Sequence, residues 1–151
     1  MRQPHPLEAV RVESMSRHAL LVRGALAAGA VYGTAMVSPF LRRAFAQADM
    51  DDVDILNFAL TLEYLETAFY EEGVKLDLGD EVRAQARRFG AEEAEHVDAL
   101  TATIKELGGT PARMPAFDFG LSDEASFLEL AVTLEDTGVG AYNGAGPAIE
   151  S

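Results

Sequence analysis

The sequence predicts an all-α protein, and three observations support that class. Apolar residues recur every three or four positions in three segments after residue 50, which is the period of an amphipathic helix. No segment shows the alternating pattern of a β-strand. Two stretches 72 residues apart share one pattern, which is typical of a duplicated helical hairpin. With 151 residues and 48% hydrophobic content, the chain can form one domain with a core.

Charge divides the chain into two parts. Residues 1–48 contain six Arg and two Glu, whereas residues 49–151 contain six Lys or Arg and 23 Asp or Glu. Such an acidic body repels nucleic acid and attracts cations, so we expect metal ions and no nucleic acid among its partners. The absence of cysteine excludes disulfides, thiolate zinc sites and cysteine nucleophiles.

Residues 1–48 have the pattern of an export signal. A basic start precedes a weakly apolar run at 24–41, and small-residue cleavage sites follow it. The start resembles a twin-arginine signal, except that His18 replaces its second Arg and Leu20 its Phe. We expect the acidic domain to be exported to the periplasm or outside the cell. The alternatives are an inner-membrane anchor at residues 20–41, so that the N-terminal segment contacts membrane, and an ordinary core helix.

Two helices are predicted at the start of the acidic domain, residues 49–151. Acids at 49–52 are favourable at the positive end of a helix dipole, and the first helix runs from 53 to about 74. A short glycine-containing loop follows. The second helix runs from 80 to 107, where a Gly-Gly pair ends it.

A third helix is predicted after a connection of about a dozen residues, 110–121. Ser122-Asp123-Glu124 has the pattern of its N-terminal cap. Glycines from Gly138 onward weaken this helix by about 1 kcal/mol each relative to Ala.

Glu63 and the pair formed by Glu93 and His96 are predicted to meet. In an antiparallel hairpin that turns near Leu78, Glu63 and Glu93 each lie about 15 residues from the turn, at one height. His96 shares a helix face with Glu93 because the two are three residues apart. Two carboxylates and one imidazole suit iron, manganese or zinc better than calcium. A Glu facing a Glu-x-x-His is the pattern of four-helix carboxylate sites that hold two metals.

A solvated charge or a structural ion pair is the plainer interpretation of one histidine among many acids. Other nearby acids also compete for the role. Glu92 and Glu95 lie on other faces of the second helix, where solvent is their expected surrounding. Glu66 lies one turn beyond Glu63 on nearly the same face and is a direct competitor.

An internal repeat favours Glu63 and adds Glu135. Residues 59–63 (ALTLE) match residues 131–135 (AVTLE), and in each copy a Tyr follows the Glu by seven positions. The match makes Glu135 the counterpart of Glu63. A glycine occupies the counterpart of Glu66, so the repeat selects Glu63 as the functional residue.

The same repeat predicts a fourth helix. Adding 72 to the positions of Glu93 and His96 gives 165 and 168, beyond the last residue of this sequence. We therefore expect a second Glu-x-x-His on a helix that this chain lacks, which would make the chain a truncated form of the duplicated bundle.

Four segments carry a resemblance to a known family. Residues 57–70 (NFALTLEYLETAFY) and 92–97 (EEAEHV) resemble the first two helices of bacterial ferritin-like domain proteins, a group related to desiccation-associated proteins. Residues 117–120 (FDFG) and 133–145 (TLEDTGVGAYNGA) resemble the loop and third helix. The match spans about residues 52–147. It implies a ferritin-like four-helix bundle that here lacks its fourth helix and follows an N-terminal signal or apolar helix.

The resemblance also implies a centre of two metals, iron or manganese. By position, Glu63, Glu93 and His96 would hold one metal, with Glu93 bridging to the second. Glu135 would be the first ligand of that second metal.

Three functions are open for such a chain. The first is a di-metal protein of the cell envelope that oxidises metal(II) with dioxygen or peroxide. The second is a non-enzymatic stress or desiccation-related envelope protein that keeps the fold. The third is an inactive fragment whose exposed helical face forms a homodimer. The sequence leaves the metal, the substrate and the enzymatic status open.

Overall fold

A computed structural model describes residues 51–145, and it describes the side chains of residues 51–136. The described residues contain three helices. These are α3 (Asp52–Gly73), α4 (Asp80–Glu106) and α5 (Glu124–Ala145). The described residues contain no strand, so the predicted all-α class is confirmed. None of these helices is long and apolar enough to cross a bilayer. The export signal and the membrane anchor predicted within residues 1–48 lie outside the described residues.

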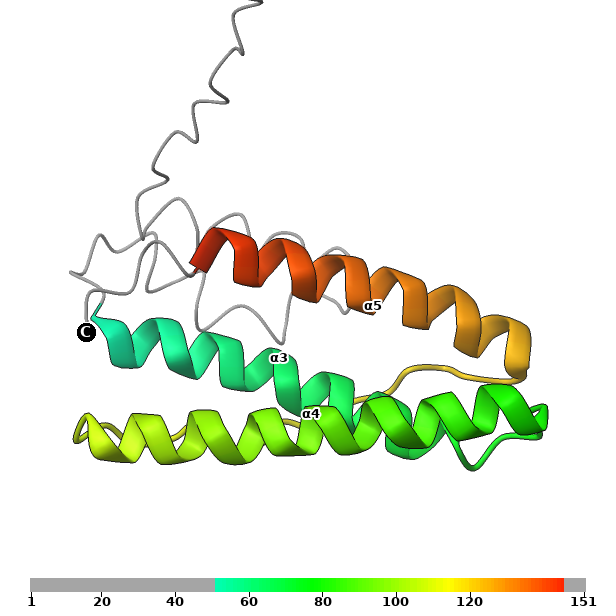
Figure 1. Ribbon diagram of the computed structural model, residues 1–151, viewed down its shortest axis with the longest axis horizontal. Helices are drawn as coiled ribbons and strands as arrows, with labels where there is room; N and C mark the ends of the chain where they lie inside the picture. The colour runs from blue at the N-terminus through cyan, green and yellow to red at the C-terminus, as the bar shows by residue number, and fades with distance from the viewer. Residues whose placement is uncertain (1–50, 146–151) are drawn as a thin grey trace, which may run out of the picture.

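The helices form a hairpin with a third helix laid beside it (Figure 1). α3 and α4 are antiparallel, as predicted, and α5 runs in the same direction as α4. This arrangement requires a long crossover, and residues 107–123 run along the bundle to provide it. Both α4 and α5 contact α3, which is therefore the central element of the described structure.

Local capping chemistry sets the helix boundaries. The Asp51 carboxylate accepts a hydrogen bond from the Asp54 amide at 2.9 Å and begins α3. At the start of α5, the Asp123 carboxylate accepts from the Ser126 amide, and the Ser126 hydroxyl accepts from the Asp123 amide. α4 ends where Gly108 adopts a φ of 77°, a left-handed conformation that favours glycine. All three boundaries lie within two residues of their predicted positions.

The glycines of α5 do not end the helix. α5 continues past Gly138 and Gly140 and ends at Ala145. A penalty of about 1 kcal/mol per glycine weakens a helix without forbidding it.

Phe69 is the centre of the larger core cluster. Its side chain is fully buried and stacks on Phe127 of α5, with ring centroids 4.9 Å apart. Edge-to-face contacts join it to Tyr70 and to Phe119 of the crossover. Gly73 permits this packing because a Cβ there would overlap the Phe127 ring. The cluster fixes α5 and the crossover against α3.

Asn57 anchors the start of the crossover to α3. Its side-chain amide donates to the Thr110 carbonyl at 3.1 Å and its carbonyl accepts from the Ala112 amide at 2.6 Å. We expect Asn57→Ala to lower the free energy of unfolding by about 1–3 kcal/mol, because two crossover groups lose their partners. Urea unfolding measures the change. Glu71→Ala, at an exposed position of the same helix, is the control, and equal effects of the two variants would contradict the anchoring role.

Candidate metal centre

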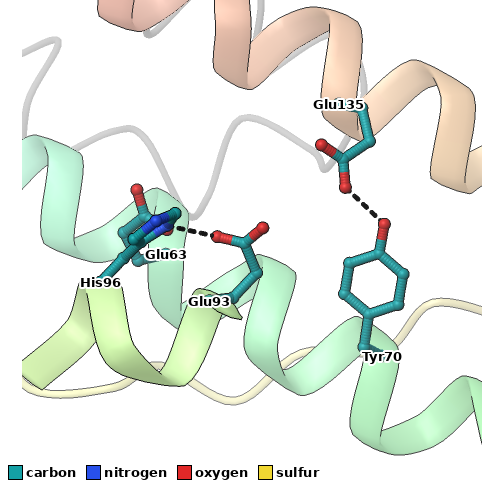
Figure 2. A network of polar contacts seen from close by, with 5 residues as sticks. All are labelled: Glu63, Tyr70, Glu93, His96 and Glu135. Atoms are coloured by element: carbon teal, nitrogen blue, oxygen red, sulfur yellow. Dashed lines mark hydrogen bonds and ion pairs between the residues drawn. The ribbon is translucent and has the colours of Figure 1, made fainter. Parts of the chain in front are cut away.

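Glu63, Glu93 and His96 converge in the interior of the hairpin. Glu63 comes from the middle of α3, and the other two from the middle of α4 (Figure 2). Each residue offers a ligand atom, and these atoms lie within 4.8 Å of one another. The His96 Nδ1 lies 2.8 Å from Glu93 Oε2 and 3.2 Å from Glu63 Oε2. The structure thus brings together the three residues that the hairpin geometry predicts.

The group reaches from the core to the surface. Glu63 is 0% exposed and Glu93 is buried, whereas the His96 side chain is 55% exposed. α3 and α4 approach closely beside this group, since a Cβ at Gly90 would lie 2.9 Å from the Cβ of Tyr70. The glycine at position 90 therefore permits a close approach of α3 and α4 one turn before Glu93.

Burial and charge perturb the titration of this group. Burial raises the pKa of Glu93 to about 7, and Glu63 adds to the rise while His96 opposes it. Burial lowers the pKa of His96, but its hydrogen bond to Glu93 and the charges of both carboxylates outweigh burial, so the net shift is upward. Near neutral pH, protons and any bound cation therefore compete for the same oxygen atoms.

Glu66 is a fourth acid of this interior, which the repeat had set aside. It is 7% exposed. Burial is the main cause that raises its pKa to about 9, followed by the charges of Glu63, Glu93 and Glu135. Burial and these like charges therefore both favour the protonated form of Glu66. Its position one turn after Glu63 was the sequence signal that could have identified it.

Glu135 lies outside the three-residue group and is bonded to Tyr70. The Tyr70 hydroxyl donates a hydrogen bond to Glu135 Oε1 across the α3–α5 interface (Figure 2). Burial of Tyr70, and then this bond, raise the pKa of its phenol, so the hydroxyl keeps its proton and remains a donor. Rings of Phe69, Phe89 and Phe127 hold Tyr70 in place.

A cavity of about 790 Å³ opens between α4 and α5 beside Tyr70 and Glu135. Its walls are largely apolar and include the exposed Leu128 and Val132 of α5. The cavity therefore provides a largely apolar route from the surface to Glu135. The predicted homodimer through an exposed helical face stays a prediction.

Comparison with known proteins identifies the family. A family model described as a ferritin-like domain matches residues 51–151. The chain belongs to the ferritin-like domain family. No curated protein and no solved structure shows significant similarity to the chain. Both the resemblance and the ferritin-like fold class expected from the sequence are confirmed.

Two other acids near the candidate site lie on the surface. Glu92 and Glu95 are exposed, as predicted, and Glu92 pairs with Arg88 at 3.0 Å. The ligand roles of Glu63, Glu93, His96 and Glu135 stay predictions.

The metal-free ferritin-like domain is expected to lose stability as pH rises. The folded-state pKa of Glu66, about 9, lies above its usual 4.5, so the folded form binds the proton more tightly. The contribution of Glu66 is complete below about 4.5 and is lost as pH rises through about 9. Urea unfolding between pH 5 and 9 in a chelator checks this, with Glu66→Gln expected to flatten the dependence. An unchanged pH dependence in the variant would contradict it.

Proposed function

We propose that this ferritin-like domain binds redox-active transition metal, iron or manganese, through Glu63, Glu93 and His96. The convergence of their ligand atoms within 4.8 Å, around a fully buried carboxylate, is the observation that carries the proposal. Carboxylate and imidazole donors suit both metals. Family membership supports the same function.

A centre of two metals extends this proposal. Glu93 would bridge the two ions, and Glu135 would serve the second, as in the family architecture. Glu135 supports this because it accepts a hydrogen bond from Tyr70, which lies two turns after Glu63 on α3. Mutual repulsion of these buried carboxylates favours a bound cation.

The proposed chemistry is oxidation of metal(II) by dioxygen or peroxide. The bound metals would supply the electrons. The chain would supply the environment: burial of Glu63 limits water, and a Glu93 pKa of about 7 lets that carboxylate take up or release a proton near neutral pH. The hydrogen bond from Tyr70 keeps Glu135 in a defined orientation.

Metal analysis tests the proposal directly. The purified chain, loaded anaerobically with Fe(II) or with Mn(II) and desalted, is expected to retain metal near stoichiometrically. The iron-loaded protein is expected to develop near-ultraviolet absorption on exposure to air. His96→Ala should bind neither metal tightly, whereas Asp98→Ala, at an exposed position of α4, should match the parent chain. Retention of neither metal by the parent chain would overturn the proposed function.

A further inference from the structure

The cavity between α4 and α5 forms an open groove with apolar walls, the α4–α5 groove. Val82 and Phe89 line it from α4, and Leu128 and Val132 line it from α5. Leu128 and Val132 are 42% and 63% exposed within the described residues. Both helices pack against α3, and their contact with each other is slight. Contiguous apolar side chains on a protein surface usually have a partner, so the groove indicates an apolar occupant.

The lining of the groove also carries three acids, Glu81, Glu135 and Asp136. Glu81 and Asp136 are exposed to solvent. A second copy of this domain would bring more acids against them, because residues 49–151 contain 23 Asp or Glu and only six Lys or Arg. An apolar segment flanked by basic residues is instead complementary to the groove in both apolar character and charge.

The sequence contains one such segment before α3. Residues 24–41 are the longest stretch of the chain without an Asp, Glu, Lys or Arg. Arg23 precedes this stretch, and Arg42 and Arg43 follow it. As a helix, the stretch would be about 27 Å long, which is shorter than the 22-residue α5 beside the groove. Its apolar character, flanking charge and length all match the α4–α5 groove.

The connection to α3 is long enough for this segment to reach the groove. α3 begins at the end of the bundle where α4 and α5 finish (Figure 1). Residues 42–51 join the segment to α3, and ten extended residues span up to about 33 Å. Packed helices lie only about 8–10 Å apart. The segment can therefore lie along the groove without any change in the three helices.

We propose that residues 24–41 of the same chain occupy the α4–α5 groove as a helix, with the flanking arginines near the acidic residues of its lining. The proposal goes beyond metal binding and does not depend on it, since Glu63, Glu93 and His96 are not among the residues that line the groove. It concerns the chain that retains residues 1–48. Cleavage of an export signal would then uncover the groove, and with it the apolar route to Glu135.

Disulfide cross-linking of the full chain tests the proposal. The chain contains no cysteine, so an introduced pair reports contact between two chosen positions. Val132→Cys is combined with replacement of each of residues 30–33 by cysteine in turn, since four consecutive positions cover every side of a helix. Mild oxidation should give an intramolecular disulfide in at least one of the four, because this bond forms only where the two Cα atoms lie within about 7 Å. Intact mass and mobility on a non-reducing gel measure it.

Glu129→Cys is the matched control for Val132→Cys. Glu129 is exposed on the same helix but does not line the groove, so its pairs should give no disulfide. Maleimide labelling of the two single variants is a second measurement. Val132→Cys should react at least tenfold more slowly than Glu129→Cys, because the segment covers it. Addition of Val31→Asp, which places a charge within the apolar stretch, should remove this protection.

Two results would overturn the proposal. A disulfide-linked dimer without the intramolecular bond would assign the groove to a second copy. Absence of any disulfide, or labelling of Val132→Cys as fast as that of Glu129→Cys, would show that residues 24–41 do not cover the groove. Val132 is exposed within the three helices, so its replacement is not expected to prevent folding.

Discussion

Replacing Glu63 with Gln is expected to abolish the rise in melting temperature that Fe(II) or Mn(II) gives the ferritin-like domain. Glu63 supplies a fully buried carboxylate whose Oε2 lies 3.2 Å from the His96 ring nitrogen. An amide of the same size carries no charge and is a weaker metal ligand. Metal at 100 times its dissociation constant adds about 2.7 kcal/mol to stability. For a domain of this size, that corresponds to at least about 10 °C.

Calorimetry with and without metal measures this effect under anaerobic conditions. Glu95→Gln, at an exposed position of α4, is the matched control and should keep the full rise. Without metal, Glu63→Gln should melt no lower than the parent, because it removes one of several mutually repelling acids. A variant that kept the metal-dependent rise would show that Glu63 is not a ligand.

Phe69→Ala is expected to destabilise the metal-free domain by about 3–5 kcal/mol. The ring is fully buried and contacts three other aromatic rings, from α3, α5 and the crossover. Its removal leaves a cavity where these elements meet, and they cannot all move to fill it. Urea unfolding, followed by far-ultraviolet circular dichroism, measures the change.

Leu107→Ala is the comparison for this core variant. Leu107 is 42% exposed and lies at the end of α4, so its truncation should change stability by less than about 1 kcal/mol. Similar effects at the two positions would mean that the aromatic cluster does not hold α5 against α3.

Helix ends were predictable because they depend on neighbours in sequence. Asp51, the Asp123–Ser126 pair and the glycine at 108 each act within four residues, so the pattern alone identifies them. The meeting of Glu63 with Glu93 was also predictable. A helix has a fixed rise per residue, and a hairpin with a short loop leaves one register.

The surroundings of Glu135 were not predictable in the same way. They depend on where a long crossover places α5, and neither spacing nor helical period contains that information. The internal repeat compared residue types at equivalent positions, so it could not detect that Glu66 is buried beside its neighbours. The bond between Tyr70 and Glu135 joins residues 65 apart and follows from packing of aromatic rings.

The half-exposed ring of His96 lies on the solvent side of the proposed centre, whereas Glu63 lies in the core. An ion arriving from solution can meet this imidazole before it meets any buried carboxylate, because His96 is the exposed member of the group. Departure follows the same route in reverse. Loading and loss at this position are therefore expected to need side-chain rotation and ligand exchange, but not the unfolding of the bundle.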